Sequence, residues 1–156
     1  MTILDALLKR TSAALTKPGS EMRRTIATAH SAAFYAAVKE RTGVMPKGLS
    51  RAERADLKVA VTAQLKYYDA FAAQAAGMSD AAVAARAQMY AGSVRGTFYG
   101  ARYPGLSQYP GDGNTKCLTN CLCSLEEKDD GIHWVLDGGE HCDDCEAMAA
   151  GSPYNV

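Results

Sequence analysis

The residues with the clearest chemical potential in this sequence are cysteines, and they are concentrated in one short stretch. All five cysteines of the 156-residue chain, and two of its three histidines, lie in CLTNCLCSLEEKDDGIHWVLDGGEHCDDC, residues 117–145. Thiolate and imidazole are ligands that zinc prefers, and four of them complete a tetrahedral site. The pattern therefore predicts a metal site, and its candidate ligands are Cys117, Cys121, Cys123, Cys142 and Cys145.

The sequence between the two cysteine groups predicts a β-hairpin. CLCSLEE and IHWVL place apolar residues at alternate positions, and KDDG between them is typical of a turn. The side chains expected on the inner faces of the two strands are Cys121, Cys123, Leu125, Ile132, Trp134 and Leu136. Because an antiparallel hairpin brings its open ends together, the cysteines before it should meet those after it.

Five thiols are more than one tetrahedral ion needs, so the ligand set has alternatives. Cys142-x2-Cys145 is a common chelating pair, whereas Cys117-x3-Cys121 is a looser one. The first choice is Cys117, Cys121, Cys142 and Cys145, with Cys123 or His141 as the substitute. Enough thiols to close the coordination sphere favour a structural zinc, which would supply stability that so short a segment cannot obtain from burial alone.

Other chemistries fit the pattern less well. Disulfides would leave one thiol unpaired, a c-type haem would need histidine where Glu146 follows Cys145, and no βαβ pattern supports a thioredoxin-like pair. The zinc-enzyme signatures H-E-x-x-H and H-x-E…P-C-x-x-C are absent, so we expect no enzyme. An iron–sulfur cluster held by four thiolates remains chemically open.

Four amphipathic helices are expected before the cysteines, and they predict a mainly α fold: a four-helix antiparallel bundle or helical array followed by a small, zinc-stapled β-hairpin module. Ser50 and Glu53 form a capping box before the third helix, and Gly43 and Gly77 are placed to end the second and third. The expected helical ranges are 2–17, 20–42, 51–76 and 80–103. His30 falls on an apolar helix face and is expected to be a packed core residue.

The fourth helix contains glycines four residues apart, at positions 92, 96 and 100. Each costs roughly 1 kcal/mol relative to alanine in a helix, so close approach of another helix is expected to compensate. Pro and Gly then interrupt regular structure, with Tyr103, Leu106 and Tyr109 as expected anchors. The expected divisions are a helical domain (1–103), a linker arm (104–116) and a cysteine-rich module (117–156).

The net charge of zero conceals two regions of opposite sign. Residues 1–116 carry 16 basic and 8 acidic side chains, a net of +8, whereas residues 117–156 carry one lysine and nine acids, a net of −8. Such regions should dock on each other or meet different partners. No apolar run approaches the roughly 18 residues of a membrane span, and MTILDALLKR does not resemble a signal peptide, so folding in a reducing cytoplasm is expected.

The segments MYAGSVRGTFYGARY and YPGDGNTKCLTNCLCSLEE carry a family resemblance. They resemble the C-terminal part of tailed-phage minor head, or head-morphogenesis, proteins of the phage Mu protein F-like group. In that group an alanine- and arginine-rich helix leads through a Pro/Gly-rich loop to an N-C-x-C element, which here is Asn120, Cys121, Leu122 and Cys123. The H-C-x-x-C at 141–145 is similar to one in some phage head proteins. The likeness covers roughly residues 80–145, although Leu122 stands where arginine is usual and the chain is shorter than most members.

The resemblance implies a non-enzymatic structural protein of a tailed-phage particle: a minor capsid, head-morphogenesis or connector-associated protein. Its implied partners are other virion proteins (capsid, portal or connector) and further copies of itself, with assembly in the host cytoplasm. The alternative is a small zinc-containing nucleic-acid-binding protein. Its expected phosphate contacts are Arg23, Arg24, Lys39, Arg51, Arg54, Lys58 and Arg86.

Overall fold

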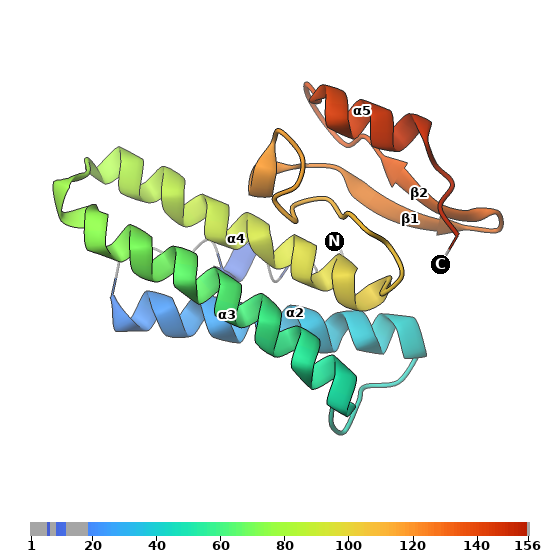
Figure 1. The fold of residues 1–156 in the computed structure, drawn as a ribbon, viewed down its shortest axis with the longest axis horizontal. Helices are drawn as coiled ribbons and strands as arrows, with labels where there is room; N and C mark the ends of the chain where they lie inside the picture. Colours follow the sequence, from blue (N-terminus) through green and yellow to red (C-terminus); the bar gives the residue numbers. More distant parts are fainter. Residues whose placement is uncertain (1–5, 7–8, 12–18, 156) are drawn as a thin grey trace.

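The computed structural model describes Ala6, residues 9–11 and residues 19–155. In this part of the chain, long helices that pack antiparallel precede a two-stranded hairpin and a short helix (Figure 1). The long helices are α2 (Ser20–Thr42), α3 (Arg51–Gln74) and α4 (Asp80–Arg102), and a 3₁₀ turn, η1 (Ala75–Gly77), follows α3. The mainly helical, antiparallel fold is thus confirmed. Of the helix expected at 2–17, Ala6 and residues 9–11 are helical, and the rest lies outside the described residues.

The helix ends form where their capping residues predict them. The Ser50 hydroxyl accepts the backbone N–H of Glu53, whose carboxylate accepts the N–H of Ser50 in return, so the predicted capping box is confirmed. Ser79 caps α4 by accepting the N–H of Ala82. Gly43 ends α2 with φ +75°, a left-handed conformation that favours glycine.

Two groups of buried side chains hold the helices together. The first lies at the end of the bundle near the α3–α4 connection, where Tyr68, Phe71 and Tyr90 form edge and tilted ring contacts beside Met22 and Ile26. The second begins between α2 and α4, which pack more extensively on each other than either does on α3. His30 lies in this interface, fully buried, and its ring nitrogens bond the hydroxyls of Thr97 and Ser93. Its predicted place in the core is therefore confirmed.

The hairpin is shorter than the sequence predicts. Its strands are β1 (Ser124–Lys128) and β2 (Gly131–Val135), so Cys121 and Cys123 precede the first strand and Leu136 follows the second. Leu125 pairs with Trp134 across the strands, and both are buried with Ile132. The backbone of Tyr154 bonds the edge of β2 at Ile132 in both directions. The strand pairing therefore begins after Cys121 and Cys123, and both cysteines lie in the loop that leads into β1.

A helix that the sequence analysis did not anticipate follows the hairpin. It is α5 (Asp143–Ala150), in the acidic and alanine-rich segment after Cys142. Figure 1 shows α5 stacked on the hairpin, on the side away from α4. Asp143, Asp144 and Glu146 occupy its first turn, where negative charge favours the helix dipole.

The glycine row of α4 is covered by a loop and by the short 3₁₀ turn η2 (Leu118–Asn120) of the same chain, so the prediction of another packed helix there was wrong. A Cβ on Gly92 would clash with the carbonyl oxygen of Thr119, and one on Gly96 would lie 2.9 Å from the backbone of Asp112. Gly100 faces the ring of Tyr109 at 3.4 Å. Close approach was correctly expected, but the approaching partner is the segment that leads into the first cysteines.

The helices and the cysteine-rich segment share one hydrophobic core. A single cluster of buried side chains runs from Ala33 and Phe98 of the helices to Cys123, Trp134 and Cys145. Tyr103 is buried at the end of α4, and Leu106 and Tyr109 pack against the same cluster, as the sequence predicts. The segment is therefore continuous with the helical core. The division at 103 and 116 stays a prediction.

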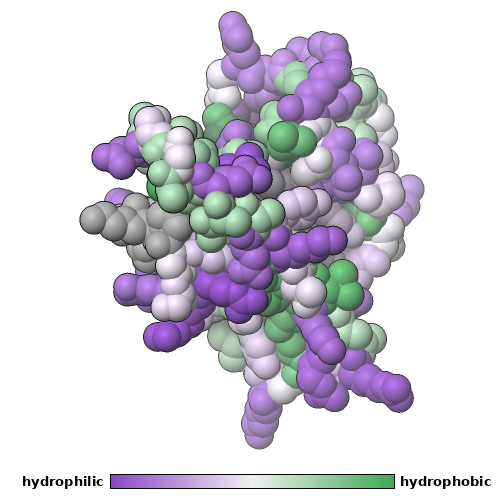
Figure 2. All heavy atoms as spheres, turned by 60° about the vertical axis from the view of Figure 1, so that its left-hand side comes forward, coloured by the Kyte–Doolittle hydropathy of each residue, from purple (hydrophilic) through white to green (hydrophobic). Residues whose placement is uncertain are grey.

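Oppositely charged side chains also join the two regions. Arg102 of α4 pairs with Glu40 and lies 3.9 Å from Glu127 on β1, and Lys116 pairs with Asp143 at 2.6 Å. Two ion pairs, Arg102 with Glu127 and Lys116 with Asp143, thus link the basic and acidic regions in the described part of the chain. On the face shown in Figure 2, hydrophilic side chains project outward among smaller hydrophobic patches. Among the described residues, no helix is both long and apolar enough to cross a membrane.

Candidate metal centre

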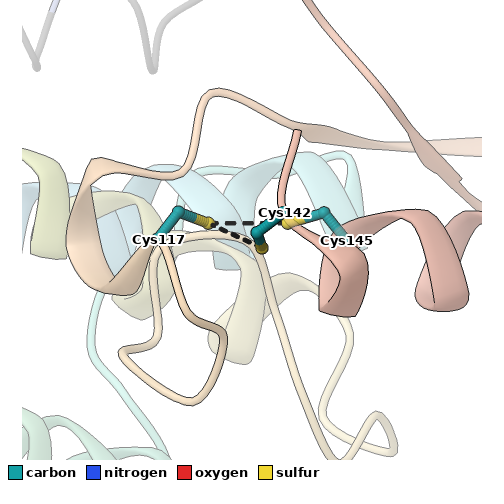
Figure 3. Close-up of side chains that lie close together, drawn as sticks. All are labelled: Cys117, Cys142 and Cys145. Carbon is teal, nitrogen blue, oxygen red and sulfur yellow. Dashed lines mark hydrogen bonds between the residues drawn. The ribbon is translucent and has the colours of Figure 1, made fainter. Parts of the chain in front are cut away.

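Three segments of the chain bring the cysteines together. Cys117 lies at the end of the loop that crosses α4, immediately before a 3₁₀ turn, η2 (Leu118–Asn120). Cys121 and Cys123 follow that turn and lead into β1. Cys142 is the residue before α5, and Cys145 lies in the first turn of that helix. Figure 3 shows Cys117 facing Cys142 and Cys145 across the gap between the loop and α5.

The sulfur atoms are spaced as metal ligands are. Cys145 Sγ lies 3.5 Å from Cys117 Sγ and 3.5 Å from Cys121 Sγ, and Cys117 Sγ lies 3.7 Å from Cys142 Sγ. Zinc–sulfur bonds of about 2.3 Å in a tetrahedron place two sulfurs about 3.8 Å apart. A disulfide would bring them to about 2.05 Å, and all five thiols are free.

The thiols form two groups of three that share one member. Cys117, Cys142 and Cys145 lie within 4.8 Å of one another, and so do Cys121, Cys123 and Cys145. His141 lies beside the second group, with its Nδ1 3.6 Å from Cys123 Sγ. All the residues predicted as ligands thus lie in one place. Which four of them hold an ion stays a prediction.

Burial and a helix end set the ionisation of these thiols in opposite directions. Burial raises the pKa of the Cys121 thiol to about 12 and raises that of Cys145 as well. The backbone N–H of Cys145 lowers the pKa of the Cys142 thiol to about 7. Without a cation the thiols of Cys121 and Cys145 are therefore neutral at pH 7, whereas metal ligation requires the thiolate. A bound divalent ion supplies the positive charge that would make ionisation of the buried pair favourable.

Residues that the sequence analysis did not single out hold the ligand-bearing segments in place. Arg95 of α4 donates to the carbonyl oxygen of Cys121 at 2.5 Å and reaches that of Cys123 at 3.5 Å. The buried Thr115 places its hydroxyl 3.2 Å from Cys117 Sγ. Of these two residues, only Arg95 could have been noticed in the sequence, because it lies between Gly92 and Gly96, where a close approach to the helix was expected.

The loop before Cys117 is also tied to the start of α5. The backbone N–H of Lys116 donates to Asp144 at 2.7 Å, and its ammonium group pairs with Asp143. These bonds connect the residue before Cys117 to the two residues that follow Cys142. The loop that ends at Cys117 and the start of α5 are therefore held together by these bonds as well as by the contact between the sulfurs of Cys117 and Cys142.

The basic residues considered for phosphate contact lie on α2, α3 and α4. Arg23 pairs with Asp69 at 3.1 Å, and Arg54 donates to the carbonyl oxygen of Leu49. Two of the seven are thus engaged within the chain. The nucleic-acid interpretation stays a prediction.

Comparisons of this chain with protein families, with curated proteins and with solved structures found no match. The site is a cluster of five thiols in a helical protein that can bind a metal ion such as zinc.

Proposed function

We propose that this chain is a non-enzymatic structural component of a tailed-bacteriophage particle, and that a structural zinc folds its C-terminal segment. The phage assignment is supported by the resemblance over roughly residues 80–145. The proposed partners are other virion proteins at the capsid, portal or connector, and further copies of the chain.

The observation that carries the structural role is the position of the thiols between segments distant in sequence. Cys117 and Cys145 are 28 residues apart, yet their sulfurs lie 3.5 Å from each other. An ion bound there would tie the loop that crosses α4 to the start of α5, with the hairpin between them. Because a short segment buries little apolar surface, such a bond contributes a large share of its stability.

The donor set favours a closed site over a catalytic one. A catalytic zinc keeps one position open for water or substrate and has a general base nearby. Here thiols alone are sufficient to fill four positions, and Cys121, Cys123 and Cys145 are buried beneath the surface. This chemistry suits a virion protein, whose task is to persist in one conformation.

Metal analysis of the purified full chain tests the zinc. We expect zinc to copurify and its removal by a strong chelator to expose residues 117–155 to protease while far-UV circular dichroism retains the signal of the long helices. A metal-free chain whose C-terminal segment resists protease would refute the structural zinc.

Mass spectrometry of purified phage particles tests the virion assignment. Particles produced by a phage that carries this gene should contain the chain at a constant ratio to the portal and major capsid proteins. A genome in which the gene lies far from head genes, together with particles that lack the chain, would remove the assignment and leave the metal site unaffected.

A further inference from the structure

The cluster holds more donors than one ion can use, and all of them are close together. Five thiols and the imidazole of His141 make six donors, whereas a tetrahedral ion takes four. A single ion would leave two of the six donors unused. If Cys121 or Cys123 is one of the two, a buried thiol is left without a metal. The excess therefore calls for a physical explanation.

The arrangement of the donors supplies one. The triad of Cys117, Cys142 and Cys145 has its own set of close sulfurs, and so has the triad of Cys121, Cys123 and Cys145. Each triad can form one face of a coordination tetrahedron. Because Cys145 belongs to both, the two faces meet at a shared sulfur, and thiolate sulfur has enough lone pairs to bind two ions at once.

The second triad has a fourth donor beside one of its members. Nδ1 of His141 lies 3.6 Å from Cys123 Sγ, so an ion held by Cys121, Cys123 and Cys145 would be completed by this imidazole. The first triad has Cys121 as its neighbour, 3.5 Å from the shared Cys145 and 97% buried. Cys145 thus lies between Cys117 with Cys142 on one side and Cys123, with His141 beside it, on the other, and Cys121 adjoins Cys145.

We propose that this cluster is a binuclear metal centre in which Cys121 and Cys145 bridge two zinc ions. One ion is bound terminally by Cys117 and Cys142, and the other by Cys123 and His141. Each ion thus has two terminal donors and shares both bridging thiolates, which fills the four positions of its tetrahedron. The inference rests on the metal-binding part of the proposed function and is independent of the virion assignment.

Charge favours two ions over one. Four thiolates around a single divalent ion give a local charge of −2 and leave the fifth thiol neutral, in a segment that already carries nine acids and one lysine. Of the nearby cations, Lys116 is paired with Asp143, and Arg95 is directed at the carbonyl oxygens of Cys121 and Cys123. A second divalent ion lowers the local charge to −1 and allows all five sulfurs to act as ligands.

Metal counting on the intact full-length chain tests the proposal. Native mass spectrometry and elemental analysis of zinc-replete protein should give two zinc ions per chain, and cadmium-113 NMR of the cadmium-substituted protein should give two resonances. One ion per chain would overturn the binuclear centre and leave the single structural zinc standing. No ion in a chain whose C-terminal segment is folded would overturn both.

Single substitutions test which donors serve which ion. His141→Asn and Cys123→Ser each remove a terminal ligand of the second ion, so each should halve the zinc content while residues 117–155 stay resistant to protease. His133→Asn is the matched control, because His133 lies on β2 and its imidazole bonds Asp130, and this variant should keep two ions. Two ions in His141→Asn, or one in His133→Asn, would overturn the assignment even if Cys123→Ser fails to fold.

Discussion

The two regions of this chain reach their folds by different means. The long helices are organised by apolar side chains at helical spacing, such as Met22, Ile26 and Val94, and by caps at their ends. The segment after residue 116 has a short hairpin, an eight-residue helix and a few large apolar side chains, chiefly Leu125, Ile132 and Trp134. Under the proposed function, the first region is stabilised by burial, whereas the second also depends on the metal that its thiols bind.

The largest expected effect is the loss of the C-terminal fold on removal of metal. Structural zinc contributes on the order of 10 kcal/mol in zinc-finger peptides, which exceeds what so small a segment gains from its core. Cys145→Ser removes the sulfur common to both triads and should unfold this segment. Trp134 is the only tryptophan and is buried there, so its fluorescence should shift to longer wavelength while the helical dichroism persists.

The control for that experiment is Leu122→Ser. Leu122 lies between two of the ligands but is 61% exposed, so its replacement should leave both metal content and Trp134 fluorescence unchanged. If the C-terminal segment of metal-free Cys145→Ser is still folded, its stability does not depend on metal and the proposed difference between the two regions is wrong.

The second effect belongs to the helical region and depends on pH. Burial lowers the pKa of His30 from 6.5 to about 4, so between these values the unfolded chain binds a proton that the folded chain does not. The free energy of unfolding should therefore fall as the pH drops from 6.5 toward 4, by about 3 kcal/mol in total. Denaturation followed by helical dichroism in excess zinc measures it.

His30→Gln tests the assignment of that pH dependence. Glutamine can still bond the hydroxyls of Thr97 and Ser93 but does not titrate in this range. The difference in unfolding free energy between the original chain and the variant should change with pH over this window. A constant difference would assign the acid sensitivity to other groups, foremost the thiols.

The third effect lies where the two regions meet. Gly92→Ala places a methyl group against the backbone of Thr119, so the loop must move and the chain should lose about 1–3 kcal/mol. Gly100→Ala is the matched control on the same helix, because its Cβ meets the ring of Tyr109 at an ordinary contact distance. It should be neutral or stabilising by up to about 1 kcal/mol, from better helix propensity. Two variants of equal stability would show that the loop is loosely held.

The smallest expected effect tests whether a helix residue supports the metal. Arg95→Met removes the donor to the carbonyl oxygens of Cys121 and Cys123, and supporting groups of this kind contribute about tenfold or more to metal affinity. Competition with a chromophoric chelator should show zinc bound roughly tenfold more weakly. Arg24→Met, on the exposed face of α2, should leave the affinity unchanged.

The helices could be predicted from the sequence because their signals are local. Ser50, Glu53 and Ser79 act on residues three positions away, and the apolar stripes repeat within each helix. The gathering of the cysteines was also predictable, since it follows from the hairpin between them. These features depend on residues close in sequence or on the pairing of two successive strands in a hairpin.

The remaining features depend on contacts between distant segments. The glycine row indicated that something approaches α4, but glycine at 92 fits a loop as well as a helix, and only the fold shows that the loop of Thr119 lies there. Helix α5 was missed because its apolar stripe is weak and its stability comes from packing on the hairpin. The grouping of the thiols into two triads depends on sulfur–sulfur distances that no sequence pattern specifies.

Helix α4 belongs to both regions, and this has a thermodynamic consequence. One side packs on α2, and the other holds the loop that carries Cys117 and the arginine that bonds Cys121. If ordering the thiols requires a folded α4, then metal binding and helix folding are linked equilibria, and linkage is reciprocal. Whatever free energy a bound ion adds to the stability of the helices, the folded helices add the same amount to the affinity for that ion.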